Sequence, residues 1–358
     1  MTDVKKLAPK REASLPASNG MKHIVVTGGA GYVGSRVAEA LAKRGYSVTA
    51  VDIATPEERR IEFSFGIEFK QHDLRIPAEA MSALKGADIV LHLAADIGSM
   101  DYMREHKADI ITNNSLIDAA VYPALVANKV AHVVYSSSSM VFQHPPRFPY
   151  TEKDIALINP PSNIYGFSKL TGEYFCRAFQ EQYGINYTII RYHNIYGAGE
   201  DSKGAKPGDI HVIPALLEKV LGGQYPLEFV GDAPDKATRP FVYIDDAVAA
   251  TVEIIEHAAK GDTAVRNDDF NIGNDRYYTI LELGKIIWEQ YGDGREFKYT
   301  VVETKSDTAL RREVDITKIR EKLGWSPKVT LEEGLKSTAE WIRTRGPVSP
   351  GEPRWITP

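Results

Sequence analysis

A glycine-rich turn between an expected strand and an expected helix constrains the fold of this chain most. The apolar run 23–27 (HIVVT) leads directly into glycines at positions 28, 31 and 34. The next segment, 36–45, has helical periodicity and ends at a glycine. Side chains at Gly28, Gly31 and Gly34 would keep the backbone away from a pyrophosphate, an anion that the unpaired N–H groups of a helix N-terminus attract. The turn therefore predicts half of a mononucleotide-binding unit.

A carboxylate at the end of the second strand supports this interpretation. The run 46–52 (YSVTAVD) predicts a strand that ends at Asp52. This spacing puts the carboxylate where the ribose hydroxyls of a bound dinucleotide are expected. The alternative, an ordinary tight turn between strand and helix, becomes less favourable once Asp52 is counted.

Strands continue to alternate with helices along the first two thirds of the chain. Long helices are expected over about 101–128 and over 165–184, and each follows a strand. This alternation predicts an α/β fold of the Rossmann type, a doubly wound parallel sheet with right-handed crossovers. The strands expected after the second one are 67–74, 87–95, 130–135 and 185–191.

From residue 197 the pattern changes, because glycine, proline and charged residues interrupt the alternation. Strands are expected over 227–232, 241–244 and 270–273, with Asp245 as the N-cap of a following helix. We interpret these segments as a smaller C-terminal substrate domain interleaved with returns to the main sheet. The expected boundaries are 1–20 for a flexible tail, 21–196 and 238–275 for the Rossmann domain, 197–237 and 276–346 for the smaller domain, and 347–358 for a second tail.

Composition restricts the partners and the compartment that we expect. A net charge of -5 gives no reason to expect nucleic acid or an anionic membrane as a partner. Cys176 is the only cysteine, so an intrachain disulfide is impossible and a cytoplasmic location is expected. No apolar run looks long enough to span a bilayer, and residues 1–20 lack the apolar core of a signal peptide.

A tyrosine and a lysine on one helix face provide candidate chemistry. Tyr165 and Lys169 are four residues apart in the expected helix, so their side chains share a face. A neighbouring ammonium, together with an oxidised nicotinamide, would favour the phenolate form of Tyr165, and Lys169 could also hydrogen-bond a ribose. Such a pair taken alone is usually part of a surface helix. Ser138 ends a strand, where the ligands of parallel sheets bind, and its hydroxyl could exchange a proton with Tyr165.

Taken together, these motifs resemble the extended short-chain dehydrogenase/reductase family, which includes the nucleotide-sugar epimerases and dehydratases. The similarity covers roughly residues 21–343. The matching motifs are, in chain order, TGGAGYVG at 27–34, DL at 73–74, LAA at 93–95, SSS at 136–138, YGFSK at 165–169, RYHNIYG at 191–197, RPFVYIDD at 239–246 and LGW at 323–325.

The resemblance implies NAD as the cofactor and assigns roles to matching positions. It implies that Tyr165, Lys169 and Ser138 are catalytic, and that Tyr165 and Lys169 also contact NAD. The other implied NAD contacts are Gly28, Gly31, Tyr32, Val33 and Gly34 at the pyrophosphate, Asp52 at the adenosine ribose, Asp73 and Leu74 at the adenine, and Ala94 and Ala95 along the cofactor. The implied contacts of the nucleotide-sugar substrate are Ser99, Ser138, Asn194, Arg239 and Arg312.

Two of these assignments leave alternatives open. Asn194 could cap a turn instead of contacting the sugar. Arg311 could take the place of Arg312 as the second arginine at the substrate diphosphate, since the two are adjacent. A guanidinium pair suits a diphosphate because its donors are arranged as a fork.

Departures from the family pattern narrow the expected reaction. Where the 4,6-dehydratases of the family carry an Asp–Glu pair, this chain has Ser139 and Met140, and the sugar-acid decarboxylases have a Glu at the position of Met140. A second resemblance, to GDP-mannose 3,5-epimerases, is carried by 95–100 and 191–197, but Met140 stands at their Cys position and their Lys position falls near Val212. A thioether cannot donate or accept a proton, so Met140 does not supply the acid–base group that these chemistries need. Lys203 is left open as a substitute for the lysine of the 3,5-epimerases.

The sequence therefore predicts an NAD-dependent nucleotide-sugar epimerase that retains its cofactor and inverts C4 through a transient 4-keto sugar. The alternatives are an enzyme like GDP-mannose 3,5-epimerase, a 4-ketoreductase, a dehydratase or a decarboxylase, and lastly a cofactor-sensing protein without activity. The resemblance also implies a homodimer that pairs through the helices near 101–128 and 165–184.

Overall fold

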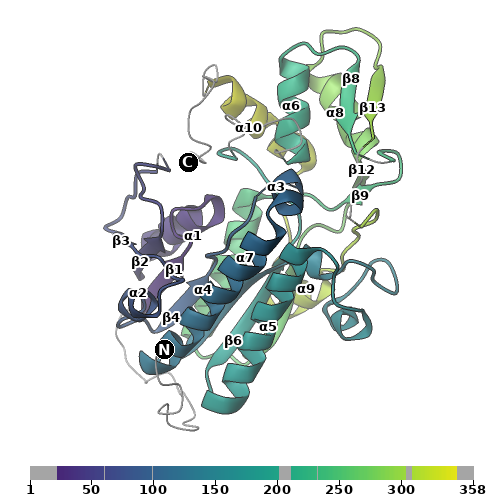
Figure 1. The fold of residues 1–358 in the computed structure, drawn as a ribbon. Coiled ribbons are helices and arrows are strands. Elements are labelled where there is room, and N and C mark those ends of the chain that lie inside the picture. The colour runs from purple at the N-terminus through teal and green to yellow at the C-terminus, as the bar shows by residue number, and fades with distance from the viewer. Residues whose placement is uncertain are drawn as a thin grey trace.

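The computed structural model describes residues 22–59, 61–98, 100–200, 211–231, 233–303 and 309–344. Both predicted tails, the predicted substrate residue Ser99 and the alternative lysine Lys203 lie outside these ranges. The centre is a seven-stranded, entirely parallel sheet with the order β11-β6-β5-β4-β1-β2-β3 (Figure 1). Its strands are β1 (His23–Thr27), β2 (Ser47–Asp52), β3 (Glu68–Gln71), β4 (Ile89–His92), β5 (His132–Ser138), β6 (Asn186–Tyr192) and β11 (Asp268–Ile272).

The strand order reverses between β1 and β4, which makes this the switch point of the sheet. Ligands of doubly wound sheets bind beside the carboxyl ends of the strands at such a point. The Rossmann-type prediction from the alternating pattern is therefore confirmed, and the glycine-rich turn lies at the switch point.

Helices cover both faces of the sheet, as a fully parallel sheet requires. Helices α2 (Pro77–Ala83), α4 (Lys107–Ala127) and α5 (Ile164–Tyr183) pack over one face, and α1 (Tyr32–Lys43) and α7 (Ile244–Ala259) pack over the other (Figure 1). Successive residues of β1 face opposite layers, because Ile24 belongs to the core under α1 and Val25 to the core under α2 and α4.

Helix α5 has clear start and stop signals. The Asn163 side chain accepts a hydrogen bond from the backbone N–H of Gly166 at 3.0 Å, and Gly184 ends the helix with a positive φ of 78°. Glycines on its inner side allow close packing. A Cβ atom at Gly172 would lie 1.9 Å from the Tyr135 hydroxyl oxygen, so only glycine fits against β5 there.

Three expectations for the helices need correction. The helix expected over 101–128 is two helices, α3 (Met100–Glu105) and α4, because the backbone of His106 leaves the helical conformation. Helix α7 begins at Ile244 after Tyr243 as the N-cap, so Asp245 is in the first turn, where its charge complements the helix dipole, and is not the cap.

The third correction concerns α4, which is long and apolar enough to cross a membrane by length and composition. The expectation that no such stretch exists is therefore wrong. This helix packs against α2 and α5, and Asn114 and Asp118 on its inner side are buried. The core helix of a globular fold can be equally long and apolar.

A smaller group of elements packs at the upper end of the molecule in Figure 1. It contains α6 (Val212–Leu221), α8 (Ile280–Tyr291) and α10 (Leu331–Thr344), with β8 (Leu227–Val230) and β13 (Tyr299–Val302) paired in parallel. Two short pairs link it to the main sheet, β7 (Ile195–Tyr196) with β10 (Val242–Tyr243) and β9 (Thr238–Arg239) with β12 (Tyr278–Thr279). Helix α9 (Thr317–Leu323), which the predicted boundaries assign to the smaller domain, packs against β11 of the main sheet.

Candidate active site

At the glycine-rich turn the backbone packs so closely on itself that side chains do not fit. Gly28 has a positive φ of 68°, and a Cβ atom there would lie 2.9 Å from the backbone nitrogen of Ala94. A Cβ atom at Gly34 would lie 2.1 Å from the carbonyl oxygen of Gly28. Helix α1 starts after Gly31 with no side-chain cap on its first N–H groups. A tight turn that only glycines can form, followed by a helix whose first N–H groups have no side-chain cap, fits a pyrophosphate-binding turn.

Asp52 is at the end of β2, beside this turn. Its carboxylate accepts hydrogen bonds from the backbone N–H groups of Ala30 and Ala54, each at 3.1 Å. Burial raises the pKa of Asp52, and the two backbone hydrogen bonds oppose that change. The structure therefore brings the predicted ribose-binding carboxylate next to the predicted pyrophosphate-binding turn.

The other predicted cofactor residues surround the same switch point. The backbone N–H of Ala94 donates to the Thr27 hydroxyl at 3.3 Å, so the segment with Ala94 and Ala95 runs along the turn. Val33 and Tyr32 are in the first turn of α1, and the guanidinium of Arg36 lies over the Tyr32 ring at 4.6 Å.

Asp73 follows β3 and is held by a neighbour that the sequence analysis missed. Arg75 donates to both carboxylate oxygens of Asp73, from Nη2 at 2.7 Å and from Nε at 2.9 Å, and these bonds lower the pKa of Asp73. Arg75 also donates to Asn113 of α4 at 3.1 Å. Leu74 is buried. The carboxylate of Asp73 is thus part of a bridge from β3 to α4.

Tyr165 and Ser138 meet where the start of α5 touches the end of β5. Tyr165 is 5% exposed, and its hydroxyl lies close enough to the Ser138 side chain for Ser138 to lower its pKa. A Cβ atom at Gly166 would lie 2.4 Å from the carbonyl oxygen of Met140, so this glycine permits the close approach. Burial raises the pKa of Tyr165, and Ser138 acts in the opposite direction.

Lys169 lies one turn further along α5 and is 3% exposed. Its ammonium lies 5.1 Å from the centre of the Tyr135 ring. Burial lowers the pKa of Lys169 to about 8, and the carboxylate of Asp118 opposes that change. Lys169 was expected to favour the phenolate of Tyr165, but in this structure burial and Ser138 set the pKa of Tyr165. Asp118 and its partner His92, joined at 3.1 Å, were missed because their contact spans 26 positions.

A second cluster contains the two predicted diphosphate arginines. Arg239 in β9 donates to the carbonyl oxygens of Thr238 at 2.8 Å and Leu310 at 3.0 Å. Arg312 is 8% exposed, and within the described ranges its guanidinium makes no ion pair with a carboxylate. Burial and the nearby charge of Arg312 lower the pKa of Arg239 to about 9. Two cations held together without a counter-ion among the described residues are well suited to bind an anion.

The alternatives left open for this cluster can now be placed. Arg311 forms an ion pair with Glu313 at 2.8 Å and is half exposed, whereas Arg312 is buried beside Arg239. Asn194 has a positive φ of 44° between β6 and β7, and its side chain donates to the Pro240 carbonyl at 3.4 Å. Asn194 thus serves the turn, and its predicted contact with the sugar stays a prediction.

Two further residues near the arginines were missed. The Tyr150 hydroxyl lies 3.4 Å from Nδ1 of His193, and both side chains are fully buried. The charges of Arg312 and Arg239 both act on Tyr150. A tyrosine in an irregular segment carries no periodic signal, so only the three-dimensional contact reveals it.

Comparison with known proteins places this geometry in a family. The family model described as "NAD dependent epimerase/dehydratase family" matches residues 24–273, and the chain belongs to this family. NAD is therefore its cofactor, in agreement with the geometry of the glycine-rich turn.

Its relatives include enzymes of different specificity. GDP-mannose 3,5-epimerase 1 of Oryza sativa subsp. japonica is 30% identical over 89% of this chain and 81% of its own length. A putative UDP-glucose 4-epimerase of Methanocaldococcus jannaschii is 31% identical over 89% of this chain and 98% of its own. The crystal structure of UDP-glucose 4-epimerase from Thermotoga maritima with UDP-glucose has a TM-score of 0.77 at 30% identity, covering 90% of this chain and 99% of that one.

Lys169→Met is expected to stabilise the fold while abolishing activity. The difference between the ordinary pKa of 10.5 and about 8 in the fold corresponds to about 3 kcal/mol, which is the cost of burying the charge at pH 7. Between pH 8 and 10.5 the unfolded chain binds more protons than the folded one, so the stability of the natural protein rises and the advantage of Lys169→Met disappears.

Urea denaturation of NAD-free protein at pH 7 and pH 9.5 measures this difference. Lys153→Met, at an exposed position, is the matched control and should change stability little at either pH. A Lys169→Met protein that is less stable than the natural one at pH 7, with no change at pH 9.5, would contradict the expected cost of the buried charge.

Proposed function

We propose that the protein is a nucleotide-sugar epimerase that inverts C4 through a transient 4-keto sugar and retains its NAD. The contact of Tyr165 with Ser138, next to the buried Lys169, carries this proposal. When bound, NAD+ supplies a positive charge and accepts a hydride that it later returns, so the reaction has no net oxidation.

Tyr165 and Ser138 would move the proton on the C4 oxygen. Tyr165 would accept the C4 hydroxyl proton as the phenolate and return it as the neutral phenol. Burial alone favours the phenol, and the positive charges of Lys169 and of bound NAD+ would favour the phenolate. Ser138 keeps the phenol oriented and can bond the same sugar oxygen. Arg239 and Arg312 would hold the diphosphate while the keto sugar turns its other face to the cofactor.

The residues around Met140 support C4 chemistry over the alternatives. Elimination of water, decarboxylation and exchange at carbon each need an additional acid or base near the sugar. Ser139 is buried, and its neighbour Met140 packs among Met103, Ile110 and Tyr165. Val212, at the position near which the 3,5-epimerases have a lysine, begins α6. The 30% identity to GDP-mannose 3,5-epimerase makes that enzyme class the second candidate.

Tyr165→Phe is expected to lower turnover by about 10²–10⁴-fold while NAD remains bound, because only the proton-transfer group is lost. Pure protein is incubated with UDP-, dTDP- and GDP-sugars, and the products are separated. Tyr174→Phe, at an exposed position on the same helix, is the control and should retain activity. Loss of water or carbon dioxide, or consumption of added NADH, would contradict the assignment.

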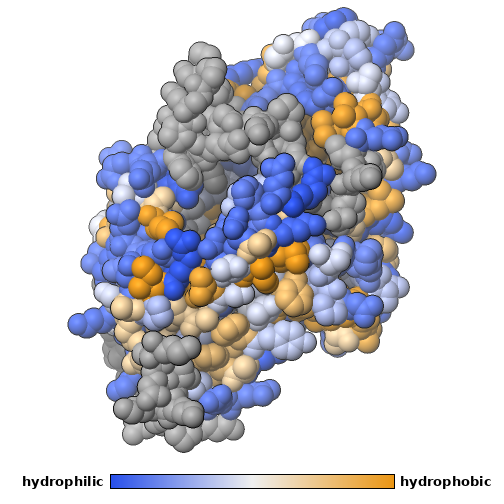
Figure 2. All heavy atoms as spheres, viewed as in Figure 1, coloured by the Kyte–Doolittle hydropathy of each residue, from blue (hydrophilic) through white to orange (hydrophobic). Residues whose placement is uncertain are grey.

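We also propose that the protein forms a homodimer through α4 and α5. These helices pack against each other, and Figure 2 shows apolar side chains among polar ones on the face that carries them. The large exposed apolar residues there are Leu116, Phe167 and Tyr174.

Leu116→Arg combined with Tyr174→Arg is expected to give a monomer, since a charge cannot be buried at such an interface without a partner. Light scattering measures the mass. Leu157→Arg, which changes an exposed apolar residue outside both helices, is the control and should leave the dimer intact. A natural protein of monomeric mass, or a double variant that still dimerises, would contradict the proposal.

A further inference from the structure

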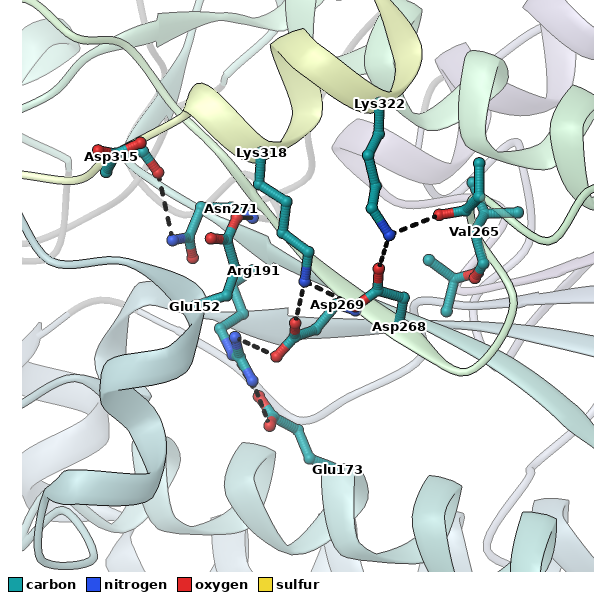
Figure 3. Close-up of polar contacts among 12 residues, drawn as sticks. Glu152, Glu173, Arg191, Val265, Asp268, Asp269, Asn271, Asp315, Lys318 and Lys322 are labelled. Atoms are coloured by element: carbon teal, nitrogen blue, oxygen red, sulfur yellow. Dashed lines mark hydrogen bonds and ion pairs between the residues drawn. The ribbon is translucent and has the colours of Figure 1, made fainter.

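A row of alternating charges runs from the catalytic helix across the sheet (Figure 3). Arg191 in β6 donates to Glu173 in α5 from Nε and from Nη2, each at 2.7 Å, and neither side chain is exposed. The remaining nitrogen, Nη1, lies 2.8 Å from a carboxylate oxygen of Asp269 in β11. This fork geometry fixes the guanidinium in position and orientation.

The row continues from β11 to α9. Lys318 donates to Asp269 at 2.7 Å and to Asp268 at 2.6 Å, and Lys322 donates to the other oxygen of Asp268 at 2.6 Å. In Figure 3 both lysines project from α9 toward Asp268 and Asp269 at the start of β11. We call these residues the charge ladder; they are Glu173, Arg191, Asp269, Lys318, Asp268 and Lys322.

The inner end of the ladder contacts β5 and α5, the two elements that carry Ser138 and Tyr165. The hydroxyl of Ser137 donates to Glu173 at 2.7 Å, and Ser137 immediately precedes Ser138. Glu173 is one helical turn beyond Lys169 on the same face of α5. This carboxylate therefore joins the end of β5 to the helix that carries Tyr165.

The outer end of the ladder holds the segment that carries Arg312. Helix α9 begins at Thr317, only five residues after Arg312. The intervening backbone is paired with Tyr150, whose N–H donates to the Glu313 carbonyl at 2.9 Å and whose carbonyl accepts from Asp315 N–H at 2.8 Å. The Arg312 N–H also donates to the Thr238 carbonyl at 3.2 Å, so this short segment is held by β9 at one end and by α9 at the other.

Stability alone is a weak reason for such a ladder, because a buried ion pair is often no more stabilising than apolar side chains of the same volume. A series of charges with fixed partners does specify geometry. We propose that the charge ladder sets the position of the Arg312 guanidinium relative to Tyr165 and Ser138, which makes Lys318 a positioning residue for the substrate diphosphate. The kinetic part of this inference rests on the proposed function.

Lys318→Met in the full-length protein tests the ladder. We expect the dissociation constants of UDP or GDP, measured by calorimetry, and the KM of the nucleotide sugar to rise about tenfold, with kcat changed less than twofold and NAD still bound. Lys318→Arg should restore affinity, since a guanidinium can pair with both aspartates. Arg320→Met is the matched control. Arg320 is on the exposed side of α9, pairs with Asp275 and lies outside the ladder.

The outcomes separate this inference from the proposed function. Unchanged diphosphate affinity in Lys318→Met, even with a lower unfolding temperature, would overturn the ladder as a positioning device. If Lys318→Met does not fold, Asp268→Asn provides a second test. This variant removes a carboxylate charge that pairs with both lysines, and the same loss of diphosphate affinity is expected. A natural protein that binds UDP or GDP without epimerising sugars contradicts the function only, whereas one that binds neither diphosphate overturns the ladder inference.

Discussion

The close approach of α5 to the end of β5 is the contact on which the rest of the site depends. Without glycine at 166 and 172, a Cβ atom would lie 2.4 Å from the Met140 carbonyl oxygen or 1.9 Å from the Tyr135 hydroxyl oxygen. Because both positions are glycine, Tyr165 reaches Ser138, and Lys169 is buried against β5 with its ammonium over the Tyr135 ring. Packing of a helix on a strand thus creates the chemical environment.

That environment buries positive charges, which lowers the stability of the unliganded fold. Lys169 is buried with its pKa lowered, and Arg239 and Arg312 lie together without a carboxylate partner among the described residues. In the proposed function, the diphosphate of the substrate would supply the negative charge that Arg239 and Arg312 lack, so substrate binding would offset the cost of holding these two cations together.

Local patterns in the sequence predict the parts of this structure that local interactions determine. The glycine turn, Asp52 at the end of β2, and Tyr165 with Lys169 on one face of α5 all depend on short-range geometry. The break at His106 and the start of α7 at Ile244 depend on packing and were missed. The charge ladder joins residues as far apart as 173 and 318, so no periodicity could reveal it.

Retention of an isotope at C4 tests the central claim most directly. The protein is incubated with a nucleotide sugar that carries deuterium on C4, in ordinary water, and the product is analysed by mass spectrometry and NMR. Transfer of the same hydrogen away from C4 and back predicts a C4 epimer that keeps its deuterium there and gains none elsewhere. A product that loses this deuterium to water, or that gains solvent deuterium at C3 or C5 when the reaction is run in heavy water, would contradict the account.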